Sequence, residues 1–228
     1  MQIQKEIDNN AIRNIIFDLG GVILNIDYRK TEQAFNDLGV TEFRKLYSQF
    51  HASDLFINLE TGRISPRGFI EEIKRYSSTK LSDNNIKQAW NAMLMDFPQG
   101  RLNFLNNIKR NYRTFLLSNT NEIHYNAIQE NYSEVMKTET PLDGCFEKVY
   151  YSHQMGMRKP DKEVFEYVLY ANHLDPAETL FIDDTFTNVE GALKTGINGL
   201  YLSTERIEDL FSDFKLTASN YLTSSKSI

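Results

Sequence analysis

The chain has 228 residues, 41% of them hydrophobic, which is enough for one sizeable domain or two small ones. Its 31 acidic and 25 basic residues give a formal net charge of -6, which argues against nucleic acid as a partner because phosphate backbones bind clustered Lys and Arg. One cysteine, Cys145, excludes an internal disulfide and a cysteine-based zinc site. The sequence shows no signal-peptide core and no apolar run long enough to span a membrane, so we expect a soluble, cytoplasmic protein without a membrane partner.

The first predicted element is a short buried strand over residues 15–17 that ends in Asp18. An apolar run of this length, bounded by turn residues, is typical of a strand in a parallel sheet. Gly20 and Gly21 follow, and they allow a sharp turn and a close approach of the backbone to whatever Asp18 contacts. Ligands of open α/β sheets bind just beyond the carboxyl ends of the strands. Asp18 is therefore either a functional carboxylate or an ordinary cap of a turn.

Residues 31–96 are predicted to form a helical insertion. Apolar residues recur at helical spacing from Val40 to Phe50, and Ser65-Pro66 and Ser82 are typical of the N-caps of two further helices. The segment shows no convincing strand, and it is too long for a loop inside a compact domain. We expect a small separate core here, in which the aromatic side chains pack together and bind no cofactor.

Beyond residue 97, helical and strand patterns alternate, with predicted strands at 114–117, 149–151, 180–182 and 199–202. Such alternation predicts right-handed βαβ units and a parallel sheet with helices on both faces. The expected fold class is α/β, a Rossmann-like parallel sheet core that the first strand also joins. The expected division is a core of residues 11–30 and 97–215, a helical cap of residues 31–96 inserted after the first strand, and a C-terminal tail of residues 216–228.

Polar residues follow the ends of these predicted strands. Ser118 and Asn119 follow one strand, the Asp183-Asp184 pair follows another, and a basic loop with Lys159 precedes a helix. Read singly, Ser118 is also consistent with a helix cap and Lys159 with a solvated loop charge. Adjacent carboxylates after a buried strand repel each other unless a cation lies nearby. Because hard oxygen ligands suit Mg²⁺, the pair predicts a magnesium site.

These motifs, in this order, resemble the haloacid dehalogenase superfamily, and the resemblance covers nearly the whole chain. The stretches Phe-Asp-Leu-Gly-Gly-Val, Leu-Ser-Asn-Thr-Asn, Gly-Met-Arg-Lys-Pro and Phe-Ile-Asp-Asp look like subfamily IA, variant 3. That group includes α-D-glucose-1-phosphatase-like proteins and the phosphatase domain of soluble epoxide hydrolases. The resemblance implies a Mg²⁺-dependent phosphatase for a small phosphorylated metabolite, with a sugar phosphate favoured.

The resemblance also implies roles for the acidic residues. Asp18 would be the nucleophile that attacks phosphorus and becomes an aspartyl-phosphate. The carboxylate of Asp18, the backbone carbonyl of Gly20 and the carboxylate of Asp184 would hold Mg²⁺, which offsets the repulsion between carboxylate and phosphate. Asp183 and Asn188 would orient the ion and its waters without direct contact.

The phosphate and the leaving group would contact other residues. By resemblance, Ser118 and the backbone of Asn119 would donate hydrogen bonds to phosphate oxygens, and Lys159 would neutralise the developing charge. Arg158 is a weaker candidate for the same role. Arg63 lies in a polar break between cap helices, where relatives lower a loop toward the site. We predict that Arg63 affects substrate choice, with a solvated turn residue as the alternative.

Gly20 departs from the usual pattern of the superfamily. Most of its phosphatases carry a second Asp at this position, which protonates the leaving group and then activates water. Without that acid, hydrolysis should favour acidic leaving groups, so sugar 1-phosphates and aryl phosphates should be preferred. A catalytically degenerate protein that binds a phosphorylated ligand or a protein partner is the alternative. A 2-haloacid dehalogenase is less favoured, because its metal-free attack on carbon would leave Asp183-Asp184 without a purpose. The sequence identifies neither the exact substrate nor the oligomeric state.

Overall fold

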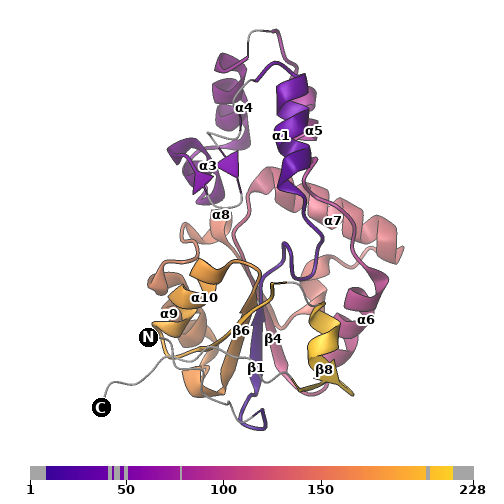
Figure 1. The fold of residues 1–228 in the computed structure, drawn as a ribbon, viewed down its shortest axis with the longest axis vertical. Helices are drawn as coiled ribbons and strands as arrows, with labels where there is room; N and C mark the ends of the chain where they lie inside the picture. Colours follow the sequence, from indigo (N-terminus) through magenta and orange to yellow (C-terminus); the bar gives the residue numbers. More distant parts are fainter. Residues whose placement is uncertain are drawn as a thin grey trace.

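The computed structural model describes residues 9–40, 43, 47–48, 51–77, 79–203 and 206–217. Its centre is a five-stranded sheet in the order β5-β4-β1-β6-β7, in which all neighbours are parallel (Figure 1). The strands are β1 (Asn14–Phe17), β4 (Arg113–Ser118), β5 (Lys148–Tyr151), β6 (Thr179–Asp183) and β7 (Asn198–Tyr201). The expected α/β class with a Rossmann-like parallel sheet is confirmed, and the first strand lies in the middle of that sheet.

Helices cover both faces of the sheet because successive side chains of a strand point to opposite faces. Ile15 and Phe17 pack in a cluster with the helices α6 and α7, whereas Ile16 packs in another with α9 and α10. The elements between and after the strands are α6 (Gln99–Ile108), α7 (Glu122–Met136), η1 (Leu142–Cys145), α8 (Ser152–Met155), α9 (Lys162–Asn172), η2 (Pro176–Glu178), α10 (Phe186–Leu193) and η3 (Ile207–Leu210).

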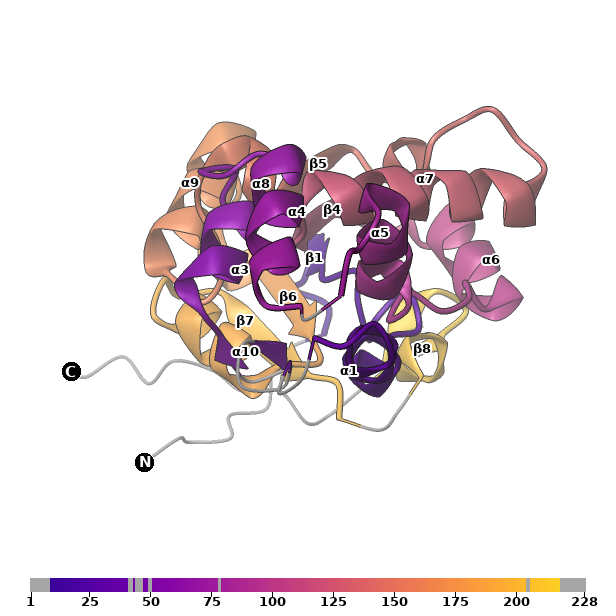
Figure 2. The same ribbon diagram turned by 90° about the horizontal axis from the view of Figure 1, so that it is seen from above.

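In the part of the chain that the structure describes, four helices stand above the carboxyl edge of the sheet in two side-by-side pairs, α1 with α5 and α3 with α4 (Figures 1 and 2). They are α1 (Tyr28–Asp37), α3 (Asp54–Glu60), α4 (Pro66–Arg75) and α5 (Asp83–Asn91). Their apolar faces form a separate cluster around Phe56 and Trp90. The predicted caps are confirmed, since Ser65 accepts a hydrogen bond from the Gly68 amide and Ser82 forms a capping box with Asn85. We call these four helices and their connections the cap.

Two short hairpins were not predicted from the sequence. In the cap, β2 (Tyr47–Ser48) pairs antiparallel with β3 (His51–Ala52), so Tyr47 lies in a strand and the expectation of helices alone was wrong there. Most of the helix expected between Val40 and Phe50 lies outside the described residues. Near the C-terminus, β8 (Phe211–Ser212) pairs with β9 (Lys215–Leu216). Leu216, the first residue of the expected tail, is buried in the core cluster.

The two connections between cap and core run side by side. Ile26 forms an antiparallel bridge with Leu94, and the Asp27 amide donates to the Met93 carbonyl at 3.0 Å. Both connections thus enter the cap at one place, directly above the carboxyl edge of the sheet. The exact limits of the two parts stay a prediction. Among the described residues, no helix is both long and apolar enough to cross a membrane.

Candidate active site

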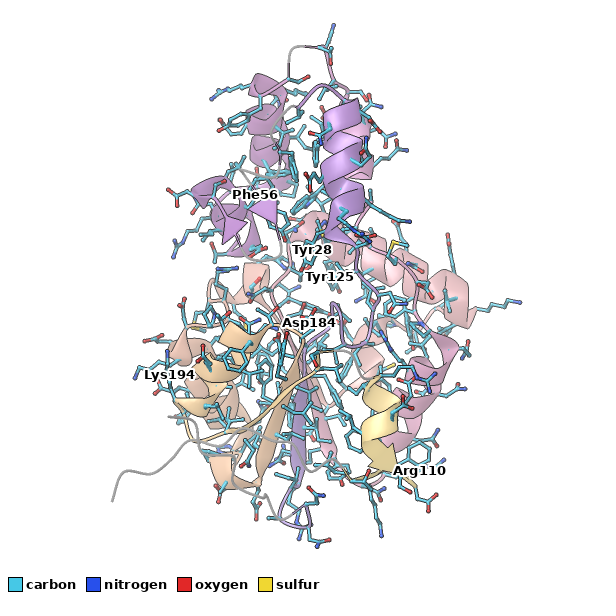
Figure 3. The ribbon with its side chains drawn as sticks, in the orientation of Figure 1. Tyr28, Phe56, Arg110, Tyr125, Asp184 and Lys194 are labelled. Carbon is cyan, nitrogen blue, oxygen red and sulfur yellow. The ribbon has the colours of Figure 1, made fainter. Side chains whose placement is uncertain are left out.

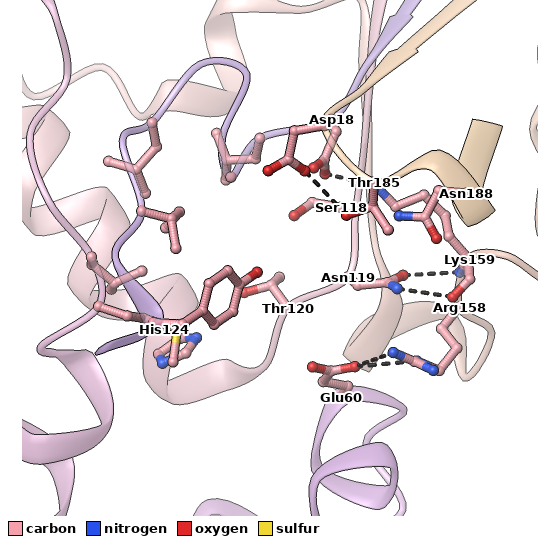
Figure 4. Close-up of a pocket in the computed structure, with 18 of the residues that line it drawn as sticks. Asp18, Glu60, Ser118, Asn119, Thr120, His124, Arg158, Lys159, Thr185 and Asn188 are labelled. Atoms are coloured by element: carbon pink, nitrogen blue, oxygen red, sulfur yellow. Dashed lines mark hydrogen bonds and ion pairs between the residues drawn. The ribbon is translucent and has the colours of Figure 1, made fainter. Parts of the chain in front are cut away.

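The candidate residues meet at the carboxyl edge of the sheet because β1 lies between β4 and β6. Phe17 is paired with Leu116 on one side and Ile182 on the other. Asp18, one residue past the end of β1, therefore lies level with the ends of both neighbouring strands. Ser118 ends β4 and Asp183 ends β6. Asp18 and Ser118 line the same cavity, which is shown in Figure 4.

Lys159 joins two of the carboxylates in the interior. Its Nζ donates to Asp18 Oδ1 at 2.6 Å and to Asp183 Oδ2 at 2.7 Å, and only 1% of the residue is exposed. Burial opposes the charged ammonium, but the two carboxylates outweigh burial and raise the pKa of Lys159. The side chain of Asn119 holds the lysine backbone from both sides, because its Nδ2 donates to the Lys159 carbonyl and its Oδ1 accepts from the Lys159 amide, each at 2.9 Å.

The adjacent residues Asp183 and Asp184 have different surroundings. Asp183 is fully buried and accepts hydrogen bonds from the Thr185 amide at 2.7 Å, from Asn188 Nδ2 and from Lys159. Asp184 lines the cavity, where its Oδ1 accepts from Thr185 Oγ1 at 3.2 Å. The carboxylate oxygens of Asp183 are therefore occupied by hydrogen bonds within the protein. The carboxylate of Asp184 faces the cavity, where a ligand would bind.

A glycine permits the close approach of Asp184 to the β1 turn. Gly21 has a φ of +74°, and a Cβ on it would lie 2.1 Å from Asp184 Oδ2. Any other residue would meet both backbone strain and this clash. The absence of a side chain at Gly21 thus leaves space for the carboxylate of Asp184, a role that the sequence pattern did not predict.

The acidic residues at this edge fit a divalent cation. Asp18, Asp183 and Asp184 each offer a carboxylate oxygen within 4.8 Å of the others. Burial raises the pKa of Asp18 and of Asp184, and repulsion from Asp183 raises both further, although Lys159 opposes the shift. A cluster with more carboxylates than cations, built from hard oxygen donors, matches the preference of Mg²⁺. Gly20 also lines the cavity, in agreement with its expected place beside such an ion.

The phosphate-binding candidates lie beside Asp18 on a loop that is fixed by hydrogen bonds. Ser118 is 4% exposed and lines the cavity together with Asn119. The next residue, Thr120, donates its amide to Ser152 Oγ and accepts a hydrogen bond from the same hydroxyl, both at 2.9 Å. These two hydrogen bonds therefore attach the loop between β4 and α7 to the first residue of α8.

The far end of the cavity is formed mostly by the cap. The cavity has a volume of about 340 Å³, and its cap side carries Tyr28, Tyr47 and Glu60, with Arg158 opposite from the core. Tyr28 lies at the base of α1, above Asp184 (Figure 3). Burial and the nearby Asp184 raise the pKa of Tyr28, which keeps its hydroxyl protonated. These tyrosines and Glu60 were missed from the sequence, since single polar residues in helical patterns normally face solvent.

The structure does not bring Arg63 to this cavity. Arg63 is exposed and lines a second cavity of about 300 Å³, which also contacts Ile57 and Arg158. The nearest polar cap residue that does line the catalytic cavity is Glu60, three positions earlier. The weaker candidate Arg158 does reach the cavity, where it pairs with Glu60 (Figure 4).

Trp90 of α5 joins the cap to the core helix α7. Its indole Nε1 donates to Asn121 Oδ1 at 3.3 Å, and the same oxygen caps α7 by accepting from the Ile123 and His124 amides. His124 stacks on the indole, with ring centroids 4.4 Å apart, and its Nε2 lies 3.0 Å from the Trp90 carbonyl. Because that carbonyl can only accept, Nε2 must carry the proton.

Comparison with known proteins assigns most of the chain to the superfamily that its sequence motifs resemble. The family model for haloacid dehalogenase-like hydrolases matches residues 12–196. The chain is 34% identical over 179 residues to D-ribitol-5-phosphate phosphatase of Bacteroides thetaiotaomicron, covering 78% of this chain and 85% of that protein. The solved HAD family enzyme bt-2542 of the same organism, a mutant in complex with magnesium and inorganic phosphate, superimposes with a TM-score of 0.83 at 32% identity, over 88% of this chain and 99% of the other.

Two other solved structures resemble this chain to different degrees, one in both sequence and fold and the other in fold alone. A predicted HAD-like hydrolase of Porphyromonas gingivalis has a TM-score of 0.76 at 32% identity, over 84% of this chain and 91% of that one. The L-2-haloacid dehalogenase of Xanthobacter autotrophicus has a TM-score of 0.56 at 17% identity, which shows a common fold and nothing further about the reaction. With its family-model match, its close relatives and its four motifs at one sheet edge, the chain belongs to the haloacid dehalogenase-like hydrolases.

Proposed function

We propose that the protein is a Mg²⁺-dependent phosphatase that acts on a small sugar or polyol phosphate through an aspartyl-phosphate on Asp18. The observation that carries this proposal is the placement of Asp18, whose Oδ1 is held by Lys159 at 2.6 Å beside the cavity-facing Asp184. The name of the relative D-ribitol-5-phosphate phosphatase supports a substrate of this class. The cavity volume of about 340 Å³ supports a small leaving group.

The protein's own residues would divide the work as follows. Asp18 supplies the attacking oxygen, and Lys159 favours the ionised form of that carboxylate and offsets the charge of the phosphate. Ser118 and the Asn119 backbone donate hydrogen bonds to phosphate oxygens. Asp18, Asp184 and the Gly20 carbonyl would hold Mg²⁺, which when bound neutralises the phosphate and lowers its repulsion from Asp18. Asp183 and Asn188 keep Lys159 and the start of α10 in place.

The position of Gly20 supports a finer proposal about the leaving group. No carboxylic acid stands there to protonate the departing oxygen, so the rate should rise with the acidity of the leaving alcohol. Sugar 1-phosphates and aryl phosphates should therefore react faster in the chemical step than phosphates of primary alcohols. A Cβ on Gly20 would lie 3.1 Å from Ile26 Cγ1, so Gly20→Asp requires Ile26 to move by a few tenths of an ångström.

The test is a panel of sugar 1-phosphates, polyol 5-phosphates, sugar 6-phosphates and aryl phosphates, each assayed with Mg²⁺ and with chelator. Activity on at least one sugar or polyol phosphate that disappears with chelator is the expected result. Absence of turnover on every phosphate, with measurable binding of inorganic phosphate, would favour the degenerate binding protein. For the leaving-group proposal, the slope of log(kcat/KM) against leaving-group pKa should be steep for the wild type and shallower for Gly20→Asp. A flat wild-type line would show that another group supplies the proton.

A further inference from the structure

The far end of the catalytic cavity contains an ion pair between Glu60 of the cap and Arg158 of the core. Arg158 donates to a single oxygen of Glu60, Oε2, from Nε at 3.1 Å and from Nη2 at 2.9 Å (Figure 4). The Glu60 side chain is 7% exposed, whereas that of Arg158 is 25% exposed. Burial raises the pKa of Glu60, while Arg158 and a hydrogen bond from Tyr47 oppose this shift. A carboxylate this buried depends on these partners for its charge.

The position of this pair is fixed from both sides. Glu60 ends α3, and the turn that follows contains Gly62, whose φ is +68° and where a Cβ would lie 2.4 Å from the His153 carbonyl oxygen. Cap and core backbones are thus in direct contact two residues after Glu60. Arg158 precedes Lys159, whose backbone is held by Asn119. Arg158 and Ile57 line both the catalytic cavity and the second cavity, so Arg158 stands between the two.

The individual charges of Glu60 and Arg158 decide which leaving groups can bind beside them. A hydroxyl group can donate to the Glu60 carboxylate and accept from Arg158 or Tyr47 without breaking the pair. Arg158 keeps N–H groups that Glu60 does not use, but a carboxylate or a second phosphate that accepts from them would lie beside the Glu60 carboxylate. Because Glu60 is buried, its repulsion of a second anion is weakly screened, and placing that anion there is costly.

We infer that Glu60 is a specificity-determining residue, which selects leaving groups whose far end is neutral and hydroxylated and rejects those that end in an anion. The inference rests on the proposed phosphatase function, and it names the chemistry of the group remote from the phosphate. It also assigns opposite effects to the two members of the pair. Glu60 disfavours an anionic end, whereas Arg158 attracts it.

The test compares ribitol 5-phosphate with ribonate 5-phosphate, which have the same primary phosphate ester and chain length but differ at the far end. The quantity measured is the ratio of kcat/KM for the polyol to kcat/KM for the acid. Wild-type enzyme should prefer the polyol by about 10-fold or more, the value of one charge-assisted hydrogen bond. Glu60→Gln should lower the ratio by about 10-fold, and Arg158→Gln should raise it. Glu72→Gln, which breaks the exposed pair of Glu72 with Arg75 on α4, is the matched control and should leave the ratio unchanged.

A purely structural role of the pair would move the ratio in the same direction in both variants, and that result would overturn the inference. So would a wild-type ratio near one, which needs no variant and is therefore independent of folding. Failure of the proposed function looks different, since the wild type would then hydrolyse neither ester nor 4-nitrophenyl phosphate. If Glu60→Gln does not fold, the sign of the shift in Arg158→Gln still decides, because a lowered or unchanged ratio contradicts the inference.

Discussion

The two ends of the catalytic cavity are built in different ways. At the phosphate end, Asp18, Ser118 and Asp183 come from three adjacent strands, and Lys159 is fixed to the same edge by Asn119. At the leaving-group end, Tyr28, Tyr47 and Glu60 come from the cap, and contacts between cap and core, such as Glu60 with Arg158, place them over the sheet. Strand pairing therefore fixes the chemistry, whereas packing between the two parts determines which molecule reaches it.

The strongest way to break the phosphate end is to remove the nucleophile. Asp18→Asn should lower kcat by about 10⁴-fold or more while the fold persists, because the amide is a poor nucleophile of nearly the same size. The variant should also fail to form the covalent phosphoenzyme, which rapid quench followed by mass spectrometry would detect. Turnover close to that of the wild type would contradict covalent catalysis and favour direct attack by water.

The adjacent carboxylates at this end should differ in what they support. Asp184→Asn should raise the Mg²⁺ concentration needed for half-maximal activity by about 10-fold or more, because this carboxylate faces the cavity. Asp183→Asn should change the Mg²⁺ requirement less but reduce the free energy of unfolding by about 2 kcal/mol, because an amide cannot accept from Thr185, Asn188 and Lys159 together. Activity titrations with Mg²⁺ and denaturation at saturating Mg²⁺ measure the two effects. Stronger loss of Mg²⁺ affinity in Asp183→Asn would reverse the assignment.

The contrast between the two ends also explains how much could be predicted from the sequence. The sheet and the strand ends at Asp18, Ser118 and Asp184 follow from short apolar runs that are each followed by polar residues. Lys159 lies in a loop before a helix, and only the family resemblance indicated a role for it. The hairpin at Tyr47 was missed, because two-residue strands leave no periodic signal and the local spacing is helical. Glu60 could not be distinguished from a solvated helix residue, because its burial depends on contacts with distant segments. Gly62, which must lie at φ +68° against His153, was the available signal for that contact.

A smaller effect on the phosphate end should follow from Gly21→Ala. The new Cβ would lie 2.1 Å from Asp184 Oδ2, so Asp184 must move and the affinity for Mg²⁺ should fall by several-fold, on the order of one hydrogen bond. Gly156→Ala is a matched control, since Gly156 has a similar φ of +70° with no atom within 4 Å of a Cβ. Both variants should lose about 1 kcal/mol of stability from backbone strain. Equal Mg²⁺ requirements in the two would show that Gly21 does not position Asp184.

The smallest effect on activity is expected at the joint between cap and core, where the predicted effect is a pH dependence of stability. Burial lowers the pKa of His124 to about 4, although its hydrogen bond with the Trp90 carbonyl opposes the shift. The unfolded chain takes up a proton near pH 6.5, whereas the folded chain does so only near pH 4, so the contribution of His124 is fully present above pH 6.5 and is lost as the pH falls toward 4. The loss of folding stability from His124 approaches roughly 3 kcal/mol near pH 4.

Chemical denaturation at pH 7.5 and pH 5 measures this effect. Between these two pH values, the free energy of unfolding should decrease less for His124→Gln than for the wild type. His173→Asn, at an exposed residue with φ +54° that Asn tolerates, controls for the loss of a histidine. If all three proteins lose equal stability between the two pH values, His124 is not held neutral at this joint, and the cap must be held in place by its other contacts alone.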